Sequence, residues 1–175
     1  LVLSARLNVA IARAGIFDLR IDLPDKFDIE SLTGDDVAYW DEVRDGGRGV
    51  IVHFKKQALG NRAINIVMGR MEKGIESQIK VPRIGVRDAV KHVGTLAVSG
   101  ERGVRLLTAT KDGVSEVHPR ELGIEQAGYL AFRILRPDWA VTLKTETLAP
   151  IVRADVLQRM DVSEGMVHGR AIVQY

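Results

Sequence analysis

Apolar and polar residues alternate along most of the chain, and a turn signal closes each alternating run. In residues 17–24, Phe17, Leu19 and Ile21 alternate with charged residues before a proline follows. Because successive side chains of a strand point to opposite faces, this run predicts a strand with one dry and one wet face. Similar runs occupy residues 37–43, 50–54, 64–69, 94–98, 104–110, 114–117, 129–135, 139–147, 151–162 and 166–175.

The spacing of these runs predicts the fold class. They recur at intervals near the 8–12 residues that are typical of β-sandwiches. No long window keeps apolar residues at the three- and four-residue intervals of a crossover helix, so we expect antiparallel sheets. The predicted fold is an all-β, antiparallel β-sandwich of two small units, residues 1–87 and 88–175. Their boundary lies within residues 82–93, and the two units could also pack as one domain.

Turn signals predict how some of these strands are connected. The glycine-rich residues 44–49 lie between two strand patterns and are expected to form a hairpin loop. Asp112-Gly113 lies between β-rich flanks, which is a strong local hairpin signal. Residues 118–123 are expected to form a single helical turn that ends at Gly123.

Composition and charge narrow the class of protein further. The hydrophobic fraction of 46% and the charged fraction of 27% are those of a globular protein with a packed core. The 25 basic and 23 acidic side chains are mixed along the chain, giving a net charge of +2, so nucleic acid is not an expected partner. With 0 cysteines the chain has no disulfides. Apolar runs fall short of the roughly 20 residues of a membrane helix, so we expect no membrane insertion by this segment.

The two ends of the chain resemble each other. The sequence opens at Leu1 without an initiator methionine and stops inside a strand pattern, so we expect it to be a segment of a longer protein. Residues 6–11 and 170–175 are similar in type, with an arginine followed by alternating apolar residues. This similarity suggests a tandem array in which the last strand opens a further unit.

Catalytic motifs are missing from the sequence, and we expect no catalytic residues and no enzyme activity. The four histidines, at 53, 92, 118 and 168, are scattered and belong to no recognisable motif. His53 lies within an apolar strand pattern, where a structural role is expected. Basic residues that could follow one sheet edge, where such charges prevent aggregation, are Lys55, Lys56, Arg62, Arg70 and Lys73.

The best binding candidates lie between residues 35 and 45. Tyr39 and Trp40 are adjacent on a predicted strand, so at least one should point outward, where an aromatic ring could stack on a sugar. The alternative is a structural role for both rings. Carboxylates that could bind calcium at one sheet end are Asp35, Asp36, Asp41 and Asp45, with Glu42 nearby. A solvated turn is the alternative for this acidic patch, and Trp139 is expected in the core.

Residues 130–139, followed by residues 148–154, resemble β-rich segments of large uncharacterised bacterial envelope proteins, and residues 17–24 look like the opening of such units. The resemblance implies a periplasmic or cell-surface location but no known reaction. We therefore expect a non-catalytic structural or adhesive module that binds a protein or a glycan and needs no cofactor. The alternative is a carbohydrate-binding module that uses calcium, and a hydrolase based on the acidic patch is a third class.

Overall fold

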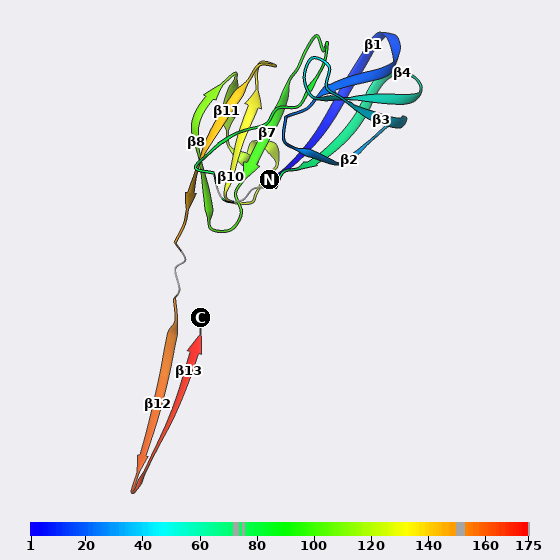
Figure 1. Cartoon of the computed structure of the whole chain (residues 1–175). Helices are drawn as coiled ribbons and strands as arrows, with labels where there is room; N and C mark the ends of the chain where they lie inside the picture. The colour runs from blue at the N-terminus through cyan, green and yellow to red at the C-terminus, as the bar shows by residue number, and fades with distance from the viewer. Residues whose placement is uncertain (72–73, 75, 150–152, 175) are drawn as a thin grey trace.

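The computed structural model describes residues 1–71, 74, 76–149 and 153–174, and these residues form strands and one short 3-10 helix (Figure 1). The predicted strand through residues 148–154 and the residues Lys73 and Tyr175 lie wholly or partly outside this set. The strands are β1 Val2–Asp22, β2 Asp28–Gly34, β3 Val37–Val43, β4 Gly49–Gly69, β5 Gln78–Lys80, β6 Gly85–Val86, β7 Gly94–Ser99, β8 Val104–Asp112, β9 Val114–Val117, β10 Tyr129–Ile134, β11 Ala140–Thr147, β12 Asp155–Ser163 and β13 Met166–Gln174, with η1 at Pro119–Leu122.

Every strand pair that the structure describes is antiparallel, which confirms the predicted all-β, antiparallel class. The largest sheet has the order β2-β4-β1-β6, and β3 also pairs with β4. Two three-stranded sheets follow, β7-β10-β9 and β5-β11-β8, and β12 pairs with β13. Within the described residues, no helix is long and apolar enough to cross a membrane.

Strands β1 and β4 are paired along most of their length, and both bend near the middle. The register shifts on either side of Ile16, Arg13 has a φ of 69°, and Gly60 has a φ of 81°. Such irregularities let a strand turn a corner without losing its partner. Strand β3 pairs with the first half of β4 and β2 with the second half, so both halves contribute to one hydrophobic cluster.

The first hydrophobic cluster is built from the apolar positions of these alternating strands. Its fully buried members include Ile21, Val50, Val52, Ile64, Ile66 and Met68. Each side chain of this size that leaves water contributes about 1.5–3 kcal/mol. The prediction that Phe17 lies on the dry face of residues 17–23 is wrong, since its side chain is 58% exposed. The shift around Ile16 places Ile16 against the cluster and turns Phe17 outward.

The second hydrophobic cluster joins the two three-stranded sheets. Phe132 of β10 and Val141 and Leu143 of β11 are almost completely buried there. Trp139 is 4% exposed, which confirms its predicted place in the core. The helical turn predicted to end at Gly123 is also present, because η1 ends there with a φ of 75°.

The hairpin predicted at Asp112-Gly113 is wrong, whereas the one between β3 and β4 is confirmed. Strand β8 pairs with β11 and strand β9 pairs with β10, so the chain turns a corner from one sheet into another. The Gly113 carbonyl accepts the N–H groups of Leu135 and Arg136, and the Arg136 guanidinium lies 2.7 Å from the Asp112 carboxylate. Contacts with a distant part of the chain therefore determine this turn.

The segment between the clusters contributes to both of them. Strand β5 pairs with β11, and Val81 directly after it is buried in the second cluster. Strand β6 pairs with β1, and Ile84 and Val86 pack against the first cluster. Proline 82 follows the end of β5, where its missing N–H leaves no ladder position unfilled. The chain thus crosses between the two clusters within a few residues.

Candidate functional site

The aromatic pair on β3 has one ring in water and one against the core. Tyr39 is 58% exposed, while Trp40 is half-buried and packs against the first hydrophobic cluster. The prediction that at least one of the two points outward is confirmed, and Tyr39 is the residue that does so. The Tyr39 ring stacks on the His53 ring, with 4.4 Å between the ring centroids and 22° between the planes.

His53 lies between two carboxylates under the Tyr39 ring. Its Nδ1 is 2.5 Å from the Asp18 Oδ1, and its Nε2 is 3.3 Å from the Asp41 Oδ2. Asp18 of β1 and Tyr39 of β3 are both the register partners of His53 on β4, so their side chains share one face of the sheet. The carboxylates orient the imidazole, and the oriented ring in turn supports Tyr39.

The four aspartates predicted to bind calcium lie in different places along β3 and its turns. Asp35 and Asp36 form the turn before β3, Asp41 lies within the strand, and Asp45 lies in the loop after it. At about 3.3 Å per residue, a seven-residue strand separates its two ends by roughly 20 Å. In the part of the chain that the structure describes, no three or more such residues are grouped to hold a metal ion.

These aspartates have separate partners instead. The Asp35 carboxylate accepts the Ala63 N–H at 3.0 Å. Asp36 has a φ of 57° and lies 3.6 Å from both Lys56 and Arg62. The Asp35 and Asp36 carboxylates therefore tie the turn before β3 to residues of the neighbouring strand β4.

Three basic residues of the same region are likewise engaged. Lys56 and Arg62 pair with Asp36, and Arg70 lies 3.6 Å from Glu76 and 5.3 Å from the centre of the Phe27 ring. Their alkyl stems and charges cover the surface of the first sheet.

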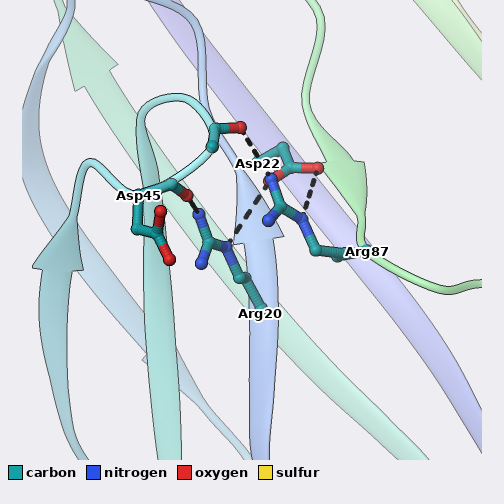
Figure 2. A network of polar contacts seen from close by, with 5 residues as sticks. Arg20, Asp22, Asp45 and Arg87 are labelled. Carbon is teal, nitrogen blue, oxygen red and sulfur yellow. Dashed lines mark hydrogen bonds and ion pairs between the residues drawn. The ribbon is translucent and has the colours of Figure 1, made fainter.

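A second polar network fastens β6 to the end of β1 (Figure 2). The Arg87 guanidinium reaches both oxygens of Asp22, with Nη2–Oδ1 at 2.7 Å and Nε–Oδ2 at 3.4 Å. Its Nη2 also donates to the Gly46 carbonyl at 3.1 Å, and Arg20 donates to the Asp45 carbonyl. The network therefore joins β1, the β3–β4 loop and the segment that follows β6.

Beside this loop lies an open hollow of about 430 Å³ lined by Asp25, Lys26, Asp28, Arg44, Gly47 and Arg48. The Arg48 guanidinium donates to the carbonyls of Pro24 and Phe27, so it fixes the turn that forms one wall. The hollow is polar and shallow, and the Arg48 guanidinium in its lining is already engaged in holding the adjacent turn.

The hairpin of β12 and β13 has a different character from the other sheets. All its described residues are exposed, and Figure 1 shows it extending away from the rest of the protein. Residues directly opposite each other in its register share a face. One face carries Val156, Gln158, Met160, Val162, Val167, Gly169, Ala171 and Val173, and the other carries Asp155, Leu157, Arg159, Asp161, Ser163, Met166, His168, Arg170, Ile172 and Gln174.

The first of these faces carries five large apolar side chains that are exposed to solvent, Val156, Met160, Val162, Val167 and Val173. Met160 is 60% exposed, Val162 is 76% exposed and Val167 is 65% exposed. We call the eight residues from Val156 to Val173 on this face the apolar hairpin face. A two-stranded hairpin is at best marginally stable alone in water, so a surface that covers this face would stabilise it.

Sequence reasoning predicted Tyr39 but missed both the partners of His53 and the hairpin face. Asp18, Asp41 and His53 lie on three different strands, and only the register brings them together. The alternation in residues 155–174 was the available signal for the hairpin face. Comparison with protein-family models, with curated proteins and with solved structures finds no match to this chain.

Proposed function

We propose that the chain is a non-catalytic interaction module of a larger bacterial envelope protein, with its sheets packed as sandwich-like units. The observation that carries this proposal is the apolar hairpin face, which is presented to solvent on an element separate from both hydrophobic clusters. Contiguous exposed apolar side chains are typical of surfaces that bind another protein.

Two further features support a role in binding. Both outer edges of the hairpin carry backbone N–H and C=O groups that no described strand pairs with, which is the arrangement that accepts an added strand. In the first sheet, by contrast, His53, Asp36 and Arg87 are engaged in pairs that orient the sheet's own turns and strands.

The test places a photoreactive amino acid at Met160 and, in a matched variant, at Leu157. Both side chains are similarly exposed, at 60% and 68%, but they lie on opposite faces of the same strand. After illumination with a bacterial envelope fraction, we expect crosslinked products from position 160 in large excess over position 157. Equal yields from the two positions, or turnover of a glycan or peptide substrate by the purified chain, would contradict the proposal.

A second candidate function, carbohydrate binding, is favoured by the stack of Tyr39 on His53. One face of the Tyr39 ring rests on the imidazole, which two carboxylates orient, and the ring is 58% exposed. An aromatic ring held in this way can stack on the apolar face of a sugar, and neighbouring carboxylates can accept its hydroxyl protons.

A glycan array, run with and without calcium, tests this second candidate. The informative variant is Tyr39→Ala, and Phe17→Ala is its control because Phe17 is equally exposed at 58% on β1. Binding that disappears in the first variant and persists in the second supports the candidate. Silence on every glycan, or equal loss in both variants, refutes it.

A further inference from the structure

Strand β13 resembles the first half of β1 in its alternation of small or apolar residues, with two identical residues, Arg6 with Arg170 and Val9 with Val173. Aligning Arg170 with Arg6 places Val173 at Val9 and Val167 at Leu3. In β1 these positions, with Ala5 and Leu7, form the half-buried side that packs towards the first hydrophobic cluster. In β13 the same positions form part of the apolar hairpin face. The two strands therefore present the same pattern to opposite environments, one covered and one open.

Hydrogen bonding shows which edge of β13 lacks a partner. Leu1 and Arg70 exchange both backbone hydrogen bonds, at 2.7 and 2.8 Å, so every second residue after Leu1, including Leu3 and Val9, directs its N–H and C=O towards β4. In the hairpin, a two-residue turn separates Ser163 from Met166, and the pair flanking such a turn is hydrogen-bonded. Residues 167, 169, 171 and 173 therefore direct their backbone groups away from β12.

The direction of the side chains and the direction of the backbone groups both alternate along β13, and together they identify its open edge. The residues of β13 that match Leu3, Ala5, Leu7 and Val9 direct their backbone groups to an edge that no described strand pairs with, whereas those four residues of β1 bond to β4. Along Val2–Ile11, β1 has β4 on one side, and none of the described strands pairs with its other side. In β13 it is this second side that β12 occupies. The edge that remains open on β13 is thus the one on which β1 holds β4.

We propose that the free edge of β13 binds an extended protein segment with the pattern of the second half of β4, added antiparallel as a further strand. This inference rests on the proposed function and names the chemistry of its partner. In the β1 register, Ile64 and Ile66 lie opposite Leu7 and Ala5. The matching positions on β13 are Ala171 and Gly169, which are small enough to leave room for two large apolar side chains.

The other surfaces of the hairpin fit this partner less well. The opposite face also carries Leu157, Met166 and Ile172, but its Arg159, Arg170 and His168 disfavour burial against an apolar layer. Pairing of β13 with β13 of a second copy around Arg170 would place two guanidinium groups opposite each other. A strand of the β4 pattern instead brings alternating apolar side chains to the apolar hairpin face.

The test uses a synthetic peptide of residues 61–70 and the complete chain. We expect a dissociation constant on the order of 10–100 µM, typical of weak strand addition. The variant Ala171→Pro removes an N–H from the free edge of β13, and we expect it to weaken binding at least about tenfold. The matched control is Gln158→Pro, which removes an N–H from the free edge of β12 and should leave peptide binding unchanged. A peptide of the same composition in scrambled order should not bind.

Disulfide trapping provides a second measurement that does not depend on proline, and it is unambiguous because the chain has 0 cysteines. Val67 lies opposite Ser4 in β1, and the position of β13 that matches Ser4 is His168. A peptide with Val67→Cys should therefore crosslink to His168→Cys and not to Asp161→Cys, which lies opposite His168 on β12.

Three results of these measurements would overturn the inference: equal disulfide trapping at positions 161 and 168, unchanged peptide binding in Ala171→Pro, or no binding at about 1 mM peptide. A dimer of the chain that is joined through position 168 and that the peptide does not displace would also overturn it. Failure of the peptide together with strong photocrosslinking from position 160 would overturn the choice of partner alone. Absence of photocrosslinking from position 160 would overturn the proposed function itself.

Discussion

Replacing Arg87 with alanine should destabilise the protein by more than a surface ion pair would. The change removes the two contacts with Asp22, at 2.7 and 3.4 Å, and the hydrogen bond to the Gly46 carbonyl at 3.1 Å. It leaves the backbone bond from the Arg87 N–H to the Arg20 carbonyl in place. The loss is therefore confined to the side chain that joins the β3–β4 loop to β1.

The expected magnitude follows from the exposure of the two partners. The side chains of Arg87 and Asp22 are 32% and 44% exposed, so solvent screens their attraction and the pair itself contributes no more than about 1 kcal/mol. The solvent-exposed hydrogen bond to the Gly46 carbonyl adds no more than about 1 kcal/mol. We expect a total loss of about 1–2 kcal/mol, which lowers the melting temperature by roughly 3–6 °C in a chain of this size.

Urea unfolding measures this loss, and a double-mutant cycle with Asp22→Ala isolates the pair. The coupling energy should be near 1 kcal/mol and should decrease in high salt. Lys111→Ala is the control, because Lys111 and Glu116 form a 3.0 Å pair with side chains that are 44% and 38% exposed and join β8 to β9, the strand that follows it directly in the chain. If Arg87→Ala costs no more than Lys111→Ala, the network does not fasten β6 to the first sheet.

Four further outcomes are expected. Phe132→Ala should cost about 3–5 kcal/mol in chemical unfolding, because the ring is fully buried in the second cluster, and a cost below about 1 kcal/mol would contradict that packing. Gly113→Ala should destabilise more than Gly103→Ala: both have positive φ, which costs about 1 kcal/mol for alanine, but only at Gly113 would the new Cβ lie 3.0 Å from the Trp139 Cα. Trp40→Ala should lower the unfolding free energy by about 2 kcal/mol or more and Tyr39→Ala by less than about 1 kcal/mol, since only the first ring packs on the core; the reverse order would exclude the assigned facing. In hydrogen-exchange mass spectrometry, the amides of β12 and β13 should exchange much faster than those of β4, and slow exchange in the dilute chain would show that the hairpin is already covered.

The sequence predicted the elements well wherever neighbouring residues decide them. Ile64, Ile66 and Met68 alternate with less buried positions, and all three are fully buried on one face of β4. The outward ring of Tyr39 follows from the same rule. Alternation within a strand is a local property, so it can be recognised before any partner is known.

Local sequence patterns did not predict which strands pair with each other or in which register. Asp112-Gly113 has the residues of a tight hairpin, yet β8 pairs with β11 and β9 with β10, so the two strands join different sheets. Phe17 lies outside the core because of a shift in the pairing of β1 with β4. The contacts of His53 with Asp18 and Asp41 depend on the same long-range register.

The crossing of the chain between β5 and β6 also determines how the protein can be divided. Cutting the polypeptide at residue 87 would deprive β11 of its neighbour β5 and the second cluster of Val81. Cutting it ahead of β5 would remove β6 from the edge of β1 and expose the Ile84 and Val86 side of the first cluster. Neither of these two scissions yields fragments that keep all of their strand pairs and buried residues.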